Sequence, residues 1–161
     1  MKYIRRAEES DIPRILELLV QVDMVHHNGR PDLFKGPATK YNAQELRKIF
    51  ADQTTPVFVC TNDEGMIMGH AFCIHQQIPD HPVMSDVKTL YIDDICVDEA
   101  FRGHGVGRSL YRHIMDYARL HEIYNITLNV WACNQDALSF YEAMGFKLQK
   151  MGMEIVLGSE S

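Results

Sequence analysis

Three alternating glycines lie between a strand pattern and a helix pattern in the stretch DICVDEAFRGHGVGRSL, residues 94–110. The apolar residues up to Val97 are typical of a buried strand, and the residues after Gly105 follow a helical period. The first N–H groups of a helix have no partner inside the helix, and the helix dipole adds partial positive charge there. Glycines let a ligand approach those N–H groups because they carry no Cβ. The stretch therefore predicts a strand–turn–helix unit that binds an anion, most simply a phosphate.

The spacing of these glycines excludes two common nucleotide-binding loops. A dinucleotide-binding G-x-G-x-x-G loop would need glycine where the chain has Arg108 or Leu110. A P-loop would need a second glycine at position 108 followed by Lys and then Ser or Thr, and these are absent. The alternative without a ligand is a glycine-rich connection that binds nothing.

Composition and charge narrow the class of protein. The chain has 161 residues and 46% hydrophobic content, which favours a single globular domain over residues 1–161. A net charge of −6 argues against nucleic acid or an anionic membrane as a partner. The sequence contains no run of about 20 apolar residues and no recognisable leader at its start. We therefore expect a cytoplasmic protein.

Neither the cysteines nor the histidines predict a metal site. The four cysteines, Cys60, Cys73, Cys96 and Cys133, lie far apart in apolar surroundings and form no C-x-x-C motif. The histidines lack the spacing of metal ligands. We expect free thiols and no bound metal.

The order of apolar patterns predicts the fold class. Strands are expected at 2–7, 56–63, 66–78, 87–98, 125–132 and 146–157, and helices at 10–22, 43–52, 107–123 and 134–144. Asn134 is a candidate N-cap of the last helix and Gly145 its C-terminal stop. A long loop is expected at 26–42. The order predicts an α/β (α+β) fold: a mixed, mostly antiparallel sheet of about six to seven strands with helices on both faces.

Two motifs in this order resemble the GNAT superfamily of N-acetyltransferases. The first is the Arg-x-x-Gly-x-Gly spacing at Arg102, Gly105 and Gly107. The second matches the pattern N-x-x-A-x-x-F-Y-x-x-x-G-F, at Asn134, Ala137, Phe140, Tyr141, Gly145 and Phe146. The resemblance covers nearly the whole predicted element order. It implies acetyl-CoA as the donor co-substrate and a primary amine as the acceptor, which would attack the thioester directly in a ternary complex.

The resemblance also implies where the donor would bind. The diphosphate would bind along Arg102, Gly103, His104, Gly105, Val106, Gly107, Arg108 and Ser109. The pantetheine arm would lie along Ile95, Cys96 and Val97, in a gap between this strand and the strand at 125–132. In the family the side chain that corresponds to Asn134 also reaches this arm. A backbone N–H at or near Val97 would stabilise the oxyanion.

Two adjacent carboxylates are candidates for the general base. Asp93 and Asp94 lie in an otherwise apolar strand, where charge is expensive to bury. Alternation along a strand predicts that their side chains point to opposite faces. We favour Asp93, by its similarity to the position of a carboxylate in polyamine-type members of the family. Asp94, Glu99 and a chain of water molecules are the alternatives, and both aspartates could instead serve only as structural partners.

The resemblance makes Tyr141 the candidate general acid, because a phenol can return a proton to the departing thiolate. The alternative is a core residue, since Tyr141 lies in an apolar helical stripe with Ala137, Phe140 and Met144.

The acidic charge and the two aspartates favour a small cationic amine as the acceptor. A peptide or protein amine is the alternative acceptor, and a non-catalytic acyl-CoA sensor or another nucleotide binder is the alternative protein class. Members of the family are often dimers, so a homodimer is one expected arrangement.

Overall fold

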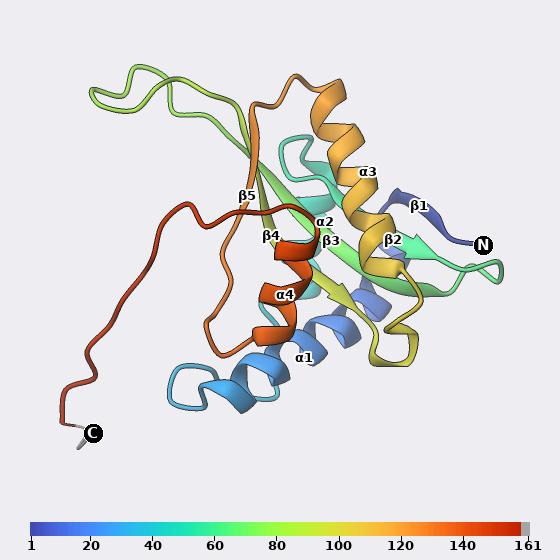
Figure 1. The fold of residues 1–161 in the computed structure, drawn as a ribbon. Helices are drawn as coiled ribbons and strands as arrows, with labels where there is room; N and C mark the ends of the chain where they lie inside the picture. Colours follow the sequence, from blue (N-terminus) through green and yellow to red (C-terminus); the bar gives the residue numbers. More distant parts are fainter. Residues whose placement is uncertain (159–161) are drawn as a thin grey trace.

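The computed structural model describes residues 1–158, and residues 159–161 at the end of the predicted domain lie outside this part (Figure 1). The sheet has five strands, β1 Tyr3–Arg6, β2 Val57–Thr61, β3 Ile67–Gln76, β4 Thr89–Val97 and β5 Asn125–Leu128. They lie in the spatial order β1-β2-β3-β4-β5. The first four are antiparallel, and β5 pairs with β4 in parallel. The prediction of a mixed, mostly antiparallel sheet is therefore confirmed.

Helices cover both faces of this sheet. They are α1 Ile12–Gly29, α2 Ala43–Ala51, α3 Val106–Leu120 and α4 Gln135–Ala143, with single 3-10 turns at Glu9–Asp11 and Glu99–Phe101. The apolar stripe of α3 packs on one face, where its residues Val106, Leu110, Ile114 and Ala118 join Phe58, Cys60 and Leu90. The stripes of α1 and α2 pack on the other face, where Ile15, Leu18 and Leu46 join Val57, Val59 and Phe72. Successive residues of β2 thus alternate between two cores, which explains why this strand is entirely apolar until Thr61.

Two element boundaries and one whole strand differ from the sequence-based expectation. Helix α1 runs to Gly29, so the long connection to α2 begins at Arg30 rather than at residue 26. Strand β5 ends at Leu128 rather than at residue 132. The strand predicted at 146–157 is absent: residues 147–156 are exposed and form no helix or strand, so the described chain has five strands rather than six or seven. A segment with alternating apolar residues forms a strand only where a neighbouring strand pairs with its backbone N–H and C=O groups. No strand of residues 1–158 pairs with this segment.

An ion pair at the start of α1 is expected to make stability depend on pH. The Arg5 guanidinium donates to both oxygens of the Asp11 carboxylate, at 2.7 and 2.9 Å, and the Glu8 N–H donates to the same carboxylate at 2.8 Å. Burial tends to raise the pKa of Asp11, but these donors outweigh it and hold the pKa below its ordinary value. A carboxyl with a depressed pKa stabilises the fold above its unfolded pKa, near 4, and that contribution is lost as the pH falls.

We therefore expect Asp11→Asn to lower the free energy of unfolding by about 1–3 kcal/mol at pH 7. Urea unfolding at pH 7 and at pH 3 measures the effect, and the difference from the wild type should shrink at pH 3. Asp63→Asn is the matched control, because Asp63 pairs with the exposed N-terminal amine. An Asp11→Asn effect as small as that of the control would contradict the prediction.

Candidate active site

The glycine turn between β4 and α3 presents backbone N–H groups at the surface. Gly103 and Gly105 have φ of 81° and 79°, a left-handed conformation that other residues rarely adopt. The Ser109 N–H bonds back to the Gly105 carbonyl at 3.0 Å and closes the first turn of α3. The N–H groups of the preceding residues in this turn therefore have no acceptor inside the helix. Anions bind to such free N–H groups at the start of a helix. The phosphate site at this turn stays a prediction.

The two strands beside this turn separate before they reach it. Pairing between β4 and β5 runs from Thr89–Asn125 to Ile92–Leu128 and stops there. Strand β4 continues to Val97, and among residues 1–158 only β3 pairs with this last part. The backbone at Ile95–Val97 is thus open toward the side where β5 would lie. An extended, amide-containing ligand could bind along this edge as an added strand.

One large cavity connects the open edge with the glycine turn. Its volume is about 2380 Å³, and all of the predicted site residues line it except His104 and Ser109. The Cys96 side chain is buried in the core under α1 and donates to the Leu18 carbonyl at 3.5 Å. Burial raises the pKa of the Cys96 thiol to about 12, so only the backbone of this residue is available to a ligand. Glu99, one of the alternatives for the base, does not line the cavity.

A β-bulge in β4 changes the expected directions of the two aspartates. Phe72 of β3 pairs with Asp94, but the next residue, Cys73, pairs with Ile92, so Asp93 is an extra residue in the strand. The side chains of Asp93 and Asp94 therefore both reach groups on the α1–α2 side of the sheet. The prediction that they point to opposite faces is wrong, because the bulge interrupts the alternation on which it rests.

The two carboxylates have different partners. Asp93 accepts hydrogen bonds from the Lys40 ammonium and the Tyr41 hydroxyl, both at 2.6 Å. Asp94 lies 2.8 Å from Nε2 of His70, a fully buried side chain whose Nδ1 has no partner in the described part of the chain. Asp93 is thus already paired with a cation, whereas Asp94 contacts one buried imidazole through Oδ2 and lines the cavity.

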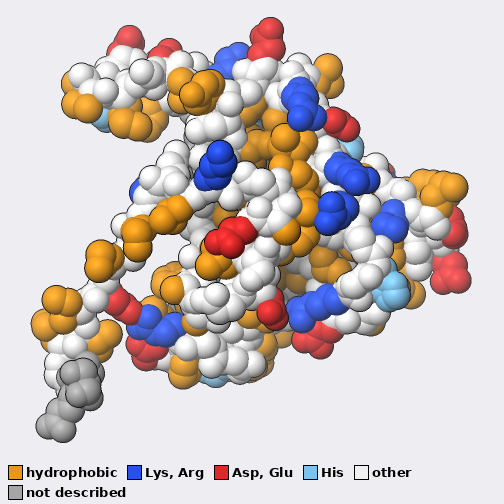
Figure 2. Space-filling model, in the orientation of Figure 1, with side chains coloured by type: hydrophobic (Ala, Val, Ile, Leu, Met, Phe, Trp, Pro, Cys, Tyr) orange, Lys and Arg blue, Asp and Glu red, His pale blue; other side chains and the backbone are white. Residues whose placement is uncertain are grey.

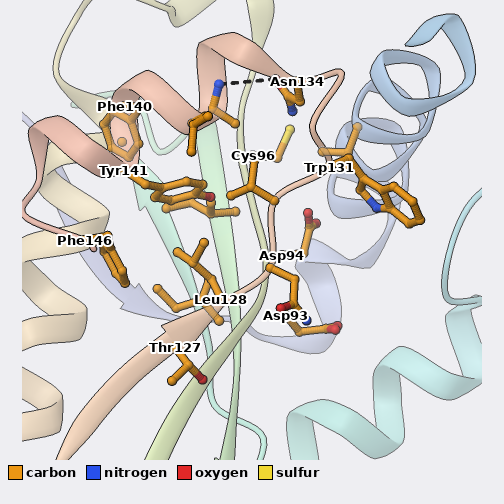
Figure 3. A pocket seen from close by; sticks show the side chains of 18 of the residues that line it. Asp93, Asp94, Cys96, Thr127, Leu128, Trp131, Asn134, Phe140, Tyr141 and Phe146 are labelled. Carbon is orange, nitrogen blue, oxygen red and sulfur yellow. Dashed lines mark hydrogen bonds between the residues drawn. The ribbon is translucent and has the colours of Figure 1, made fainter. Parts of the chain in front are cut away.

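Tyr141 and Asn134 approach the same space from α4. Figure 3 shows Tyr141 projecting from α4 over β4 and β5, with Asp93 and Asp94 on the adjacent part of β4. Burial, followed by the negative charge of Asp94, raises the pKa of Tyr141 well above its ordinary value of 10.0. The Asn134 side chain accepts a hydrogen bond from the Ala137 N–H at 3.2 Å, which confirms its predicted role as the N-cap of α4. These contacts bring a protonated phenol and a carboxylate to one cavity.

Sequence reasoning missed several residues of this site. Lys40 and Tyr41 come from the connection between α1 and α2, and His70 comes from β3. Trp131 and Phe34 also line the cavity, where they pack edge-to-face with ring centroids 5.0 Å apart. A histidine in an otherwise apolar strand next to a strand with two aspartates was the one available signal. The contacts of Lys40 and Tyr41 span more than 50 residues of sequence and left no local pattern.

Replacing both arginines beside the glycine turn should weaken binding of CoA. Arg102 and Arg108 are exposed and line the cavity on either side of the turn. For Arg102→Ala/Arg108→Ala we expect a loss of about 1–2 kcal/mol, which is a five- to thirtyfold rise in Kd. Titration calorimetry with CoA at low and high salt measures it, and the difference should shrink as salt screens the exposed charges. Arg112→Ala is the control, since Arg112 is exposed but lies outside the cavity lining; an equal loss in that control would contradict the prediction.

No group of three or more His, Cys, Asp or Glu side chains is placed to hold a metal ion within residues 1–158. Over the same residues, no helix has the length and apolar character needed to cross a membrane.

Comparison with known proteins defines the class of protein to which this fold and site belong. Residues 22–146 match the model of the acetyltransferase (GNAT) family, and the chain belongs to this family. A crystallised mutant of the BH1408 protein from Bacillus halodurans superposes with a TM-score of 0.93 and 32% identity, over 96% of this chain and 99% of that one. The chain is an acyltransferase of the GNAT family by these likenesses.

The relatives of known activity have different acceptors. A glucosamine 6-phosphate N-acetyltransferase from Trypanosoma brucei brucei is 26% identical over 96% of this chain and 95% of its own length. The N-alpha-acetyltransferase RimI from Mycobacterium tuberculosis is 39% identical, but over only 38% of this chain and 36% of its own length. These likenesses support acetyl transfer and do not select one acceptor.

Proposed function

We propose that the chain transfers the acetyl group of acetyl-CoA to the primary amine of a small cationic molecule, by direct attack in a ternary complex. One observation carries this proposal. A single cavity joins the N-terminus of α3, the unpaired edge of β4, the Asp94 carboxylate and the Tyr141 phenol. The helix N-terminus would bind the donor diphosphate, and the edge of β4 would bind the pantetheine arm. Asp94 would take a proton from the acceptor ammonium, and Tyr141 would give one to the departing thiolate.

The donor would bind along the two backbone features of the cavity. Its diphosphate would accept hydrogen bonds from the N–H groups between Gly103 and Arg108, with Arg102 adding charge. Its pantetheine amides would pair with the backbone of Ile95–Val97, beside which no strand of residues 1–158 lies on this side. The thioester would then lie between β4 and Tyr141, where a backbone N–H at or near Val97 could stabilise the oxyanion.

Deprotonation of the acceptor is the step that requires a base. An alkyl ammonium titrates near 10.4, so forming the neutral amine at pH 7 costs about 4.6 kcal/mol. We assign this role to Asp94 rather than Asp93, because Asp93 is already bound by Lys40 and Tyr41. His70 is a positioning residue that fixes the orientation of the Asp94 carboxylate. Asp94 would take up the proton directly or through one water molecule.

Tyr141 would complete the reaction as the general acid. When the tetrahedral intermediate collapses, its C–S bond breaks and the thiolate of CoA leaves with the electron pair. The Tyr141 hydroxyl donates its proton to that sulfur. The nitrogen, which still carries two protons after its attack, loses one of them to the Tyr141 phenolate through solvent, and the neutral amide remains. Because burial and Asp94 raise the pKa of Tyr141, the phenol stays protonated at neutral pH and the proton is available.

The charges around the acceptor end support a cationic amine. Asp23, Asp93 and Asp94 line this end together with Lys40, which pairs with Asp93, so Asp23 and Asp94 are the carboxylates without a cationic partner there. Trp131 and Phe34 form an aromatic wall beside it. A phosphate on the acceptor would be repelled by Asp23 and Asp94, whereas a second ammonium group would be attracted to them, or to Asp93 where it displaces Lys40. The free thiols are consistent with a reducing cytoplasm as the compartment in which we place this reaction.

The test is an acetyl transfer assay that follows thiol release from acetyl-CoA. The panel contains a polyamine, an aminoglycoside, glucosamine 6-phosphate and a peptide with a free N-terminus. We expect the highest kcat/KM with one of the two polycationic amines. Highest activity with glucosamine 6-phosphate or with the peptide would contradict the acceptor class. No turnover with any of them, despite binding of CoA, would favour a non-catalytic acyl-CoA sensor.

Removing the Lys40 ammonium should improve binding of a cationic acceptor. Lys40 Nζ lies 2.6 Å from Asp93 Oδ1, where a second ammonium of the acceptor would bind. A half-exposed pair of this kind is worth up to about 1 kcal/mol, so Lys40→Met should lower the acceptor KM by up to about fivefold. Lys35→Met is the control, because Lys35 is exposed and does not line the cavity. A higher KM for Lys40→Met alone would show that Lys40 helps to bind the acceptor instead.

A further inference from the structure

The glycine turn between β4 and α3 is exposed, so its own side chains do little to hold it in place. Residues 102–105 all lie at the surface, and two of them are glycines with left-handed φ. Figure 2 shows Lys and Arg side chains over α3 on the same side of the molecule, where they add charge. A site built from backbone N–H groups works only if the backbone is held, because a shift of about 1 Å can cost about a hundredfold in rate. The contacts on either side of the turn therefore decide where it lies.

On the α3 side, close packing fixes the backbone. Gly69 of β3 pairs with Val97, the last residue of β4. A Cβ added to Gly69 would lie 2.6 Å from the Cys96 carbonyl oxygen and 3.0 Å from Cγ1 of the buried Val106. The start of α3 and the end of β4 are thus in direct contact with β3, and no space is left between them for movement.

On the opposite side, an ion pair from α1 holds the residue that follows β4. Asp98 is 8% exposed, and its carboxylate accepts hydrogen bonds from the Arg14 guanidinium and, at 3.4 Å, from the Gln21 side-chain amide. Arg14 also donates to the Ile67 carbonyl of β3 from Nε at 3.3 Å and from Nη2 at 3.2 Å, and to the exposed Glu17 carboxylate at 2.9 Å. Burial tends to raise the pKa of Asp98, but its donors hold the pKa below its ordinary value, so the carboxylate is ionised at neutral pH. Arg14, Gln21 and Asp98 are here called the Asp98 cluster.

The Asp98 cluster also fixes the backbone that leads into the turn. The Asp98 N–H donates to the Met68 carbonyl at 2.9 Å, which extends the pairing of β4 with β3 by one residue. The Glu99 N–H donates to the Gln21 side chain at 3.2 Å, and the Ala100 N–H donates to the Asp98 carboxylate at 3.0 Å. Three successive N–H groups are thus bonded to this cluster or beside it, and the segment between strand and turn is held from the α1 side.

We propose that Arg14, Gln21 and Asp98 are positioning residues, which hold the end of β4 and the glycine turn in the arrangement that binds the donor. None of the three lines the cavity, so they would act only through the backbone. Asp98 directly follows Val97, at or near which the oxyanion donor is proposed, and it lies four residues before Arg102 at the turn. This inference rests on the proposed function, because it assigns a role at the same donor site.

Arg14→Met is the first test, because it removes the guanidinium and keeps an unbranched side chain. We expect kcat/KM for acetyl-CoA to fall by about 10–100-fold, with the acceptor KM within about twofold of the wild type. Arg5→Met is the matched control. It breaks the other partly buried ion pair of this region, in which Arg5 and Asp11 are 39% and 8% exposed, against 27% and 11% for Arg14 and Asp98. The control should lower the melting temperature without changing the kinetics of acetyl-CoA. Equal losses of kcat/KM in the two variants would show a general effect of stability and overturn the proposal.

Gln21→Met is a milder variant that decides the question if Arg14→Met does not fold. It leaves the ion pair intact and removes only the hydrogen bonds to Asp98 and to the Glu99 N–H. We expect a loss of about three- to tenfold in kcat/KM for acetyl-CoA and again no change in the acceptor KM. Unchanged kinetics of acetyl-CoA in Gln21→Met would overturn the proposal.

Hydrogen exchange followed by mass spectrometry tests the positioning without any substrate. In Arg14→Met, or in Gln21→Met if the former does not fold, the amides of residues 98–108 should exchange faster than in the wild type, by about tenfold for Arg14→Met, whereas those of β2 should not change. Unchanged exchange in residues 98–108 would overturn the proposal even if the wild type is an active acetyltransferase. A wild type that binds no CoA by calorimetry would instead contradict the proposed function, and with it the role of the Asp98 cluster at a donor site.

Discussion

Replacing Asp94 by Asn is expected to lower kcat by about 10²–10⁴-fold, because the amide cannot accept the proton of the acceptor ammonium. Asn has nearly the same shape and can still contact His70, so the fold and the binding of CoA should be retained. Asp93→Asn is the matched control one residue away, and it should cost less than about tenfold in kcat, since Asp93 is bound by Lys40 and Tyr41. Steady-state thiol release with saturating acceptor measures both variants.

The pH dependence of this variant separates a base from a structural carboxylate. As the pH rises toward the pKa of the acceptor, near 10.4, a growing fraction of the amine is already neutral and needs no base. The defect of Asp94→Asn should therefore shrink between pH 7 and pH 10. A defect that stays constant over this range would indicate a positional role, and a larger loss in Asp93→Asn would return the assignment to Asp93.

Replacing Tyr141 by Phe is expected to lower kcat by about 10²–10³-fold while leaving the Kd of CoA within about twofold of the wild type. The substitution removes only the hydroxyl that would protonate the leaving thiolate, and the ring keeps its contacts with Phe140 and Phe146. Single-turnover kinetics together with calorimetry of CoA binding separate these two effects. Since the pKa of Tyr141 is raised, the wild type should show no loss of activity from ionisation of this group up to pH 10.

Tyr117→Phe is the matched control for this substitution. The Tyr117 hydroxyl lies 2.7 Å from His75 Nε2, away from the cavity, and its loss should cost about 1 kcal/mol of stability without lowering kcat. If Tyr141→Phe loses no more activity than Tyr117→Phe, Tyr141 is a packing residue of α4. If it loses the binding of CoA as well, its hydroxyl contributes to donor binding rather than to proton transfer.

Features that depend only on neighbouring residues follow directly from the amino-acid sequence. The left-handed glycines at 103 and 105, the Asn134 cap and the alternating cores of β2 are each set by local sterics or by a short hydrophobic period. Short-range patterns of this kind locate the glycine turn and predict the mixed sheet without knowledge of any distant contact.

Long-range contacts set the difference between the two aspartates and the position of the segment 146–157. The bulge at Asp93 arises from the register between β3 and β4, and the partners of the carboxylates come from residues 24 to 53 positions away. The pattern at 146–157 is that of a strand, but a strand also needs a neighbouring edge, and no local sequence specifies where that edge is. Local propensity fixes what a segment can become, whereas the partners that pair its charges and backbone groups are fixed only when distant parts of the chain come together.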